Sequence, residues 1–264
     1  MSFKILFFDS GVGGLSVYNE VMKVCSSKIT SLYLFDNYCC PYGSKEENFV
    51  KSRVTSLLVK ACESMKLDMI VIACNTASTI ALDVVRKKVS IPVVGVVPAI
   101  KPAAKITTNK VIGLLATPGT IARNYTSELI NKYAKEVKVL KIGTTKLVNI
   151  AEKKIAGESF DIEDIKQVLE PWMSLSNKPD TVVLGCTHFP LIQQEISELL
   201  PNCKLVDSGE AIARRVNFLL SNMNDEITCY EKPKAYCTDT SRLSENLKIS
   251  LSRFGFESIN LFTV

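Results

Sequence analysis

Two cysteines end two similar apolar runs of this chain, and they are the residues best placed to do chemistry. Cys74 follows residues 68–73 (DMIVIA), and Cys186 follows residues 180–185 (DTVVLG). In each run an aspartate opens a hydrophobic stretch and a small residue precedes the cysteine. Such runs are typical of buried strands in parallel sheets, and ligands bind outside the carboxyl ends of those strands. The pattern predicts a site with one reactive thiol on each side of a substrate.

Polar side chains follow both cysteines. Asn75 and Thr76 follow the first and offer hydrogen-bond donors and acceptors, and a helix that begins there is expected to lower the pKa of the thiol. Thr187 and His188 follow the second. A lone histidine is usually a satisfied core or surface residue, but a Cys-x-His turn at the end of a buried strand favours function. The other seven cysteines are interpreted as small buried hydrophobes.

Two further loops follow predicted strands. Residues 8–16 (FDSGVGGLS) can present backbone N–H groups to an anion, although the glycines match neither a dinucleotide fingerprint nor a Walker motif. A glycine-rich turn in which Asp9 and Ser10 cap a helix is an equally good interpretation. Residues 41–43 (PYG) form a turn by local chemistry, and the functional interpretation places the backbone of Tyr42 and Gly43 on a substrate carboxylate.

Strand-like runs alternate with amphipathic helical patterns along the whole chain, for example helices over 46–65, 120–133 and 210–220. This order predicts an α/β protein with parallel or mostly parallel sheets, and ten strands fit two sheets better than one. The predicted strands span residues 3–8, 31–35, 69–73, 91–97, 110–116, 137–142, 181–185, 203–206, 234–238 and 258–262.

Two places divide the chain. Two prolines punctuate residues 97–102 (VPAIKP), and a second crossing follows residues 206–209 (VDSG). The two cysteine segments are 112 positions apart, which suggests related domains with one copy each. We therefore expect a first domain of residues 1–97 plus 210–264, which carries the first thiol, and a second domain of residues 98–209.

Composition excludes several classes. The net charge is +5, but no basic block suggests a nucleic-acid groove, and no apolar stretch approaches a bilayer span. Nine cysteines without a signal peptide predict free thiols in the cytoplasm. A single histidine and the absence of any CxxC pair argue against a structural metal.

Together the four loops resemble the glutamate racemases of the aspartate/glutamate racemase superfamily. The similar stretches stand in the family's order and spacing, and they cover nearly the whole chain: 8–14 (FDSGVGG), 41–43 (PYG), 73–78 (ACNTAS), 92–99 (PVVGVVPA), 185–190 (GCTHFP) and 205–209 (LVDSG). Residues 36–40 (DNYCC) depart from the family, where many members carry a Thr-Ala-Arg-type stretch.

The resemblance implies two similar α/β domains that face each other across a central cleft and invert glutamate without a metal or pyridoxal phosphate, supplying D-glutamate for peptidoglycan. It implies that Cys74 and Cys186 are the catalytic bases and that Glu152 assists. The positions that correspond to substrate contacts are Asp9, Ser10, Pro41, Tyr42, Gly43, Asn75, Thr76, Thr187 and His188, with Thr117 or Thr120 from the second domain.

Two thiols suit the inversion of a stereocentre, because a base must act on one face of the carbon and an acid on the other. Two thiolates in one closed site would repel, so the pair should titrate as a coupled unit. The resemblance assigns Cys74 to D-glutamate, with Asp9 as its neighbouring proton acceptor. It assigns Cys186 to L-glutamate, assisted by His188 and Glu152.

Three alternatives stay open. An aspartate or hydantoin racemase would use a similar thiol pair. A Cys-His hydrolase would use Cys186 and His188 but leaves the matched Cys74 segment unexplained. A non-catalytic amino-acid-binding protein would need no thiols.

The resemblance also bears on partners. Some relatives are activated by a UDP-linked muramyl-alanine precursor, and residues 96–102 (VVPAIKP) look like that subgroup. Relatives are often dimers, so the resemblance is compatible with a homodimer. We expect a small-molecule substrate, D- or L-glutamate, and neither a nucleic-acid nor a membrane partner.

Overall fold

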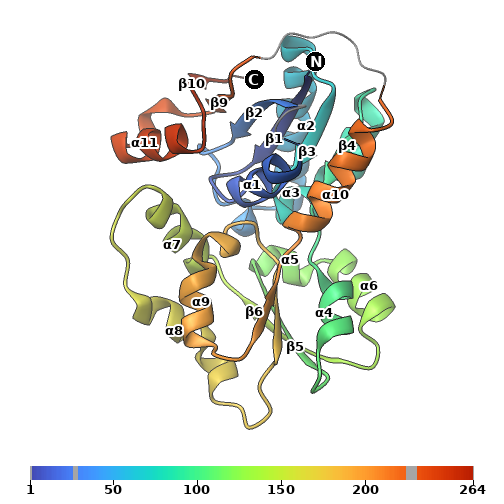
Figure 1. The fold of residues 1–264 in the computed structure, drawn as a ribbon, viewed down its shortest axis with the longest axis vertical. Helices are drawn as coiled ribbons and strands as arrows, with labels where there is room; N and C mark the ends of the chain where they lie inside the picture. Colours follow the sequence, from blue (N-terminus) through green and yellow to red (C-terminus); the bar gives the residue numbers. More distant parts are fainter. Residues whose placement is uncertain (1, 26–28, 224–230, 264) are drawn as a thin grey trace.

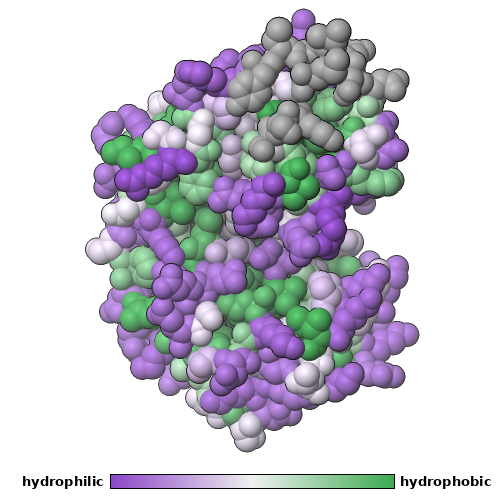
Figure 2. Space-filling model, in the orientation of Figure 1, coloured by the Kyte–Doolittle hydropathy of each residue, from purple (hydrophilic) through white to green (hydrophobic). Residues whose placement is uncertain are grey.

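The computed structural model describes residues 2–25, 29–223 and 231–263. In these ranges the chain forms two separate sheets, one above the other in Figure 1, and every paired strand is parallel to its neighbour. The predicted α/β class and the prediction of two sheets are confirmed. In Figure 2 polar residues cover most of the visible face, and the outline narrows between the two sheets on the side of α10 and α4.

The first sheet has six strands with β1 near its middle. Its order is β10 (Ser258–Leu261), β9 (Lys234–Cys237), β2 (Ile29–Phe35), β1 (Phe3–Asp9), β3 (Met69–Ile72) and β4 (Val93–Gly95). Successive side chains of β1 point to opposite faces, and both faces are buried: Ile5 and Phe7 pack in one cluster, Leu6 and Phe8 in another. Two buried faces explain why the sequence of this strand is apolar without alternation.

Helices cover both faces of the first sheet. One cluster holds α1 (Leu15–Cys25), α10 (Gly209–Leu220) and α11 (Glu245–Arg253), and the other holds α2 (Glu47–Met65) and α3 (Asn75–Lys88). The buried apolar residues of α2 recur at helical spacing, so a single stripe packs on the sheet: Val50, Val54, Leu57, Leu58 and Ala61. Two short 3₁₀ turns, η2 (Tyr42–Ser44) and η4 (Thr240–Arg242), lie in its loops.

The second sheet has four strands, in the order β6 (Lys138–Gly143), β5 (Val111–Ala116), β7 (Thr181–Leu184) and β8 (Lys204–Val206). One face packs on α7 (Lys146–Ile155), α8 (Ile162–Met173), α9 (Gln193–Leu199) and η3 (Phe189–Ile192). The other packs on α4 (Ile100–Ile106) and α6 (Asn124–Tyr133), and α5 (Pro118–Ala122) follows β5.

The helix predicted over residues 120–133 is interrupted. Arg123 has extended backbone angles and separates α5 from α6. The Thr126 hydroxyl donates to the Thr120 carbonyl across this break at 2.6 Å. The side chain of Arg123 pairs there with Glu47 of α2, so a contact between the two sheets' helices takes the place of one continuous helix.

Both sheets have the same kind of switch point. The chain runs from β1 to β2 on one side and then returns to β3 on the other, and β5, β6 and β7 repeat this order. Loops after the strands at such a point form a crevice for ligands. Cys74 follows β3 and Cys186 follows β7, as the sequence predicts.

The two connections between the sheets lie together, because the Ser208 hydroxyl donates to the Val97 carbonyl. We propose that the chain divides there, into a first domain of residues 1–97 plus 210–264 and a second of residues 98–209. The strands of each sheet fall within these bounds. Among the described residues, no helix combines the length and the apolar composition needed to cross a bilayer.

Candidate active site

The predicted site residues of the two sheets meet between them. Loops after β1 and β3 of the first sheet and after β5 and β7 of the second supply most of them. Their side chains are nearly inaccessible to solvent, with exposed fractions of 7% or less for Asp9, Ser10, Tyr42, Cys74, Asn75, Thr76, Thr117, Thr120, Cys186, Thr187 and His188.

Asp9 links the two thiol loops. Its Oδ1 accepts hydrogen bonds from the backbone N–H and hydroxyl of Ser10, at 2.5 and 3.2 Å. The Thr187 hydroxyl, from the second sheet, donates to its Oδ2 at 3.0 Å. The Ser10 hydroxyl lies 3.9 Å from the Cys74 sulfur. One buried carboxyl therefore contacts the neighbours of both cysteines.

His188 contacts Cys186. The sequence alone did not decide whether these two side chains meet. Its Nδ1 lies 3.7 Å from the Cys186 sulfur, and its Nε2 lies 2.7 Å from Oε1 of Glu152 on α7. The backbone N–H of Val12 also donates to this Glu152 oxygen, at 2.8 Å. The glycine-rich loop of the first sheet thus positions a carboxylate of the second. A side chain at Gly13 would meet the imidazole, with its Cβ 2.3 Å from Nδ1.

The prediction that the pKa of Cys74 is lowered is wrong. Burial raises the pKa of this thiol well above its ordinary value, and the negative charge of Asp9 raises it further. Cys74 does cap α3, and the amide of Ala77 favours the thiolate, but this contribution is smaller. A charge on Cys186 also raises the pKa of Cys74, so the two sulfurs share one electrostatic environment.

The other buried ionisable groups are shifted as well. Burial raises the pKa of Asp9, and His188 and a hydrogen bond from Cys74 only partly oppose it. Burial disfavours the charged form of His188, but hydrogen bonds to Cys186 and Glu152 outweigh it and raise the pKa of the imidazole well above its usual range. Such shifts are typical of sites that move protons.

Three threonines meet across the gap between the sheets. The Thr76 hydroxyl, from α3, lies 3.2 Å from that of Thr117 and 3.4 Å from that of Thr120. Beside them, the amide nitrogen of Asn75 is buried and has no hydrogen-bond partner among the described residues. A buried donor without a partner is costly, so this amide is suited to bind a polar ligand.

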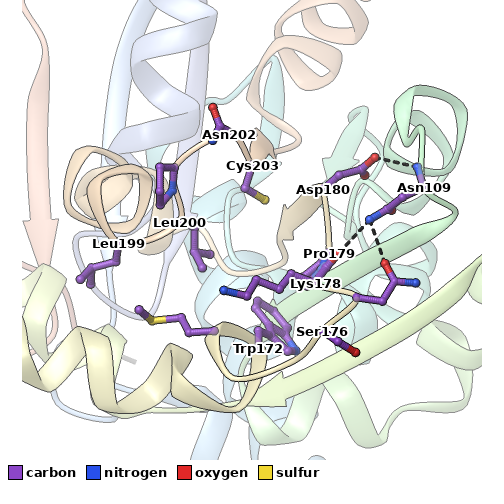
Figure 3. Close-up of a pocket in the computed structure, with 13 residues that line it drawn as sticks. Asn109, Trp172, Ser176, Lys178, Pro179, Asp180, Leu199, Leu200, Asn202 and Cys203 are labelled. Carbon is purple, nitrogen blue, oxygen red and sulfur yellow. Dashed lines mark hydrogen bonds between the residues drawn. The ribbon is translucent and has the colours of Figure 1, made fainter.

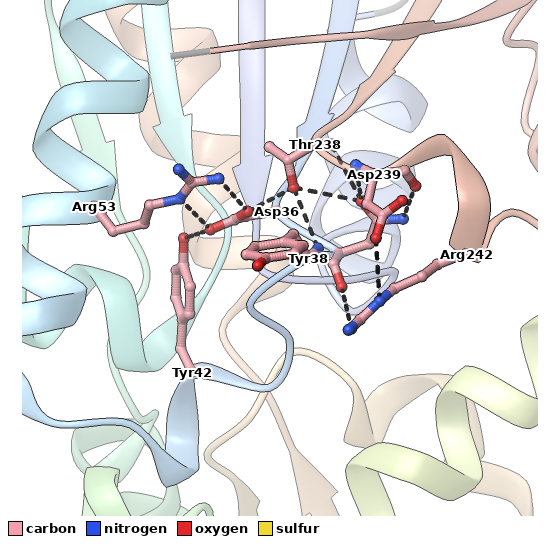
Figure 4. Close-up of polar contacts among 8 residues, drawn as sticks. Asp36, Tyr38, Tyr42, Arg53, Thr238, Asp239 and Arg242 are labelled. Carbon is pink, nitrogen blue, oxygen red and sulfur yellow. Dashed lines mark hydrogen bonds and ion pairs between the residues drawn. The ribbon is translucent and has the colours of Figure 1, made fainter.

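The loop of residues 41–43 lies against this group. The Tyr42 hydroxyl donates to Asp36 at 2.6 Å, which fixes this side chain beside Asp36 (Figure 4). Gly43 packs directly on the second sheet's loop, since a Cβ there would lie 2.5 Å from Cβ of Thr117. Pro41 is half-buried at the start of the loop.

Sequence reasoning missed Cys40, which was interpreted as a buried hydrophobe. Its sulfur lies 3.8 Å from Oε1 of Glu152, and burial together with the charges of Glu152 and Asp9 raises its pKa. The sulfur, the Glu152 oxygen and a His188 ring nitrogen lie within 4.8 Å of one another, a set that could hold a metal ion. The signal that could have found it was its position directly before the loop of residues 41–43.

The site is closed in this structure. Both thiols are buried, and the cavity beside the second one, which Asn75, Cys186 and Thr187 line but Cys74 and Asp9 do not, has a volume of about 10 Å³. A cavity of about 490 Å³ lies elsewhere, beyond the ends of β5 and β7 that face away from the site (Figure 3). Its lining includes Trp172 and Cys203 and none of the predicted site residues.

Known proteins are similar to this chain in sequence and in fold. The family model for Asp/Glu/hydantoin racemases matches residues 8–216. A glutamate racemase of Klebsiella pneumoniae (strain 342) is 46% identical over 256 residues, which are 97% of this chain and 90% of that protein. The crystal structure of Escherichia coli glutamate racemase, in complex with L-glutamate and the activator UDP-MurNAc-Ala, has a TM-score of 0.96 at 44% identity and covers 100% of this chain and 99% of its own. A glutamate racemase structure from Bacillus anthracis has a TM-score of 0.79 at 29% identity, covering 99% and 97%. The chain therefore belongs to the Asp/Glu/hydantoin racemase family and, within it, to the glutamate racemases.

Proposed function

We propose that this chain interconverts L-glutamate and D-glutamate by proton transfer between two cysteines, Cys74 and Cys186. One observation carries the proposal: two buried thiols, one from each sheet, share a single buried carboxyl, because Asp9 contacts the loops of both. A thiol on each side lets one sulfur remove a proton while the other supplies one to the opposite face of the carbon.

The neighbours of each thiol suggest the direction in which it works. Burial and Asp9 favour the protonated form of Cys74, which is the form that delivers a proton. In the L-to-D direction Cys186 would then remove the α-proton and Cys74 would supply the new one. In the reverse direction Cys74 would remove the proton, with Asp9 as acceptor. His188, between Cys186 and Glu152, would relay protons on the other side.

The weak acidity of the substrate's α-proton is the main energetic barrier to this reaction. An α-proton is far less acidic than a thiol, and each pKa unit of difference costs about 1.36 kcal/mol. Donors aimed at the α-carboxylate lower this cost by stabilising the charge that develops there. We assign this role to the Asn75 amide, to the hydroxyls of Ser10, Thr76 and Thr187, and to the backbone of Tyr42 and Gly43. Thr117 and Thr120 would add contacts from the second sheet.

Replacement of either cysteine tests the proposal. Cys74→Ala and Cys186→Ala should each lower the racemisation rate by at least about 10³-fold in both directions, because neither half-reaction can be completed. The rate is measured from the optical rotation of purified L- or D-glutamate. Cys203→Ser, in the distant cavity, is the matched control and should keep the full rate. Normal racemisation by both single variants would overturn the two-base assignment.

The metabolic setting follows from the activity. We infer that the product D-glutamate serves peptidoglycan synthesis and that the protein works in the cytoplasm. The location is supported by the eight cysteines of the described residues, among which no disulfide is formed.

We also propose that a UDP-linked muramyl-alanine precursor activates the enzyme, as it does the Escherichia coli protein, whose structure was solved with that activator. The similarity to that protein over the full chain supports this. Racemisation rates with and without the nucleotide test it: a rate that the nucleotide leaves unchanged would contradict it.

A further inference from the structure

Three metal-binding side chains from three separate segments converge at the edge of the site. Cys40 follows β2, Glu152 lies on α7 and His188 follows β7. The Cys40 sulfur is 3.8 Å from Glu152 Oε1, and His188 Nε2 is 2.7 Å from the same oxygen. All three donor atoms lie within 4.8 Å of one another. The cluster is reachable, because Cys40 and Glu152 are only half-buried.

These separations are close to those around a bound zinc ion. Ligand atoms at about 2.0–2.3 Å from a tetrahedral zinc lie roughly 3.3–3.8 Å from each other. The Cys40–Glu152 distance already fits. The His188–Glu152 distance is that of a hydrogen bond and would have to open by less than about 1 Å, which a rotation of the Glu152 side chain supplies.

The donor set has the charge that a divalent cation needs. The Glu152 carboxylate and a Cys40 thiolate would together balance the two positive charges of the ion, with His188 as a neutral ligand. A thiolate, an imidazole and a carboxylate together select a borderline-soft ion such as zinc over magnesium or calcium.

We propose that Cys40, Glu152 and His188 form a binding site for zinc, with a fourth position open to water. On binding, the Cys40 thiol and His188 Nε2 each release a proton to solvent, so the affinity should rise with pH. The site depends on Cys40, which supplies its sulfur ligand.

Zinc at this site would inhibit proton transfer at Cys186. A neutral imidazole with a metal on Nε2 carries its proton on Nδ1, the nitrogen 3.7 Å from the Cys186 sulfur. It cannot then accept a proton from that side. This consequence depends on the proposed function, but zinc binding itself does not.

Binding is tested on the full chain without substrate. Titration with cobalt(II), a spectroscopic substitute for zinc, should give one equivalent with a sulfur-to-cobalt charge-transfer band. Cys40→Ser should lose the band and bind zinc at least about tenfold more weakly in a calorimetric titration. Cys203→Ser should keep both. The same band and affinity in Cys40→Ser, or no binding by the parent chain, would overturn the proposal.

Glu152→Gln tests the same site in case Cys40→Ser fails to fold. Glu152→Gln keeps the sulfur but loses a charged ligand, so its zinc affinity should also fall by at least about tenfold. An unchanged zinc affinity in Glu152→Gln would count against the site. Inhibition by zinc is then measured as a fraction of each variant's own racemisation rate, and it should be removed by a chelator. Absence of any racemisation would overturn the proposed function but would leave the cobalt result to decide the metal site.

Discussion

His188 connects the second thiol with a carboxylate of α7. One ring nitrogen contacts the Cys186 sulfur and the other contacts Glu152, and the ring is buried. Glu152 is fixed in turn by the backbone of Val12. The protonation of this single imidazole therefore depends on a carboxylate that lies 36 positions earlier in the chain.

Removal of that carboxylate's charge should move the pH dependence of the reaction. Glu152 raises the pKa of His188, so Glu152→Gln should lower it. In the direction from D-glutamate, Cys186 supplies the new proton and protonated His188 replaces it, so the alkaline limb of the kcat/KM profile for D-glutamate should shift to lower pH, and the rate should fall by about 10- to 100-fold. The exposed Glu163→Gln on α8 is the control. A profile with an unchanged alkaline limb would show that Glu152 does not act through His188.

The same pair makes a prediction about stability. The pKa of His188 is raised in the folded protein, so the stability that its charged form contributes is fully present below the unfolded value of about 6.5. That stability is lost as the pH rises through the folded value. Urea unfolding of the parent chain and Glu152→Gln should therefore differ most at acidic pH and converge at alkaline pH.

Residue types could be predicted from sequence, but their electrostatics could not. The two thiols, Asp9 and His188 stand out by their place after apolar strands. Glu152 has little local sequence to mark it and was placed by resemblance alone. The pKa of Cys74 was predicted in the wrong direction because burial, a property of the folded protein, outweighs the helix terminus that the sequence reveals.

At the scale of elements, Asp36 connects four segments beneath the site. Its carboxylate is fully buried and accepts two hydrogen bonds from Arg53 of α2, one from Tyr42 of η2 and one from Thr238 after β9 (Figure 4). Burial raises the pKa of Asp36, but these hydrogen bonds outweigh burial and the net shift is downward. The loop of residues 41–43 is held in place by this carboxylate.

Asp36→Ala should destabilise the fold by roughly 3 kcal/mol, because it leaves Arg53 without its partner. It should also raise KM for glutamate, since Tyr42 loses its anchor. Urea unfolding and steady-state kinetics measure the two effects. Asp83→Asn, which removes an exposed ion pair on α3, is the control and should change stability by less than about 1 kcal/mol.

The pH dependence of the unfolding free energy gives an independent test of the stabilising role of Asp36. Because the folded pKa of Asp36 is lowered, its contribution is present above the unfolded value of about 3.9 and is lost as the pH falls through the folded value. The stabilities of the parent chain and Asp36→Asn should therefore converge on acidification. A constant difference down to the acid transition would contradict this role.

Elements were predicted well where the local pattern decides them. All ten predicted strands are present, with ends displaced by no more than about two residues, because each is an apolar run between polar segments. The break at Arg123 was missed. Arg123 pairs there with Glu47, which lies 76 positions earlier and which no local pattern reveals.

At the scale of the whole molecule, both thiols are buried between the two sheets, so we expect the sheets to move apart when glutamate enters. Two contacts oppose this movement on the side of α5. Gly43 packs on Thr117, and Arg123 forms an ion pair with Glu47 of α2. The closed form is thus held in part by the Arg123–Glu47 ion pair, which lies outside the chemistry.

Removal of the ion pair should favour the open form. Glu47 is half exposed, so the pair contributes about 0.2–1 kcal/mol, and Glu47→Gln should raise KM for glutamate by at most about fivefold. High salt should have the same effect on the parent chain and little on the variant. Glu210→Gln, which removes an exposed pair within α10, is the control. An unchanged KM of Glu47→Gln at low salt would show that this ion pair does not stabilise the closed form.

The whole-molecule arrangement was the hardest to foresee. Two related halves could be inferred from the repeated cysteine segment, and the prolines near residue 98 mark a crossing. The contacts that close the site join residues far apart in the sequence, such as Thr76 with Thr117 and Asp9 with Thr187. They follow from how the sheets face each other, which the resemblance implies and local patterns do not.

The fate of solvent hydrogen during single conversions tests the central claim most directly. L-Glutamate is incubated with the protein in D₂O, the two enantiomers are separated at low conversion, and deuterium at the α-carbon is measured in each; the experiment is repeated from D-glutamate. With one thiol on each face, the product enantiomer should carry deuterium while the recovered substrate stays unlabelled, in both directions. Equal early labelling of substrate and product would mean that one group serves both faces, and it would contradict the account.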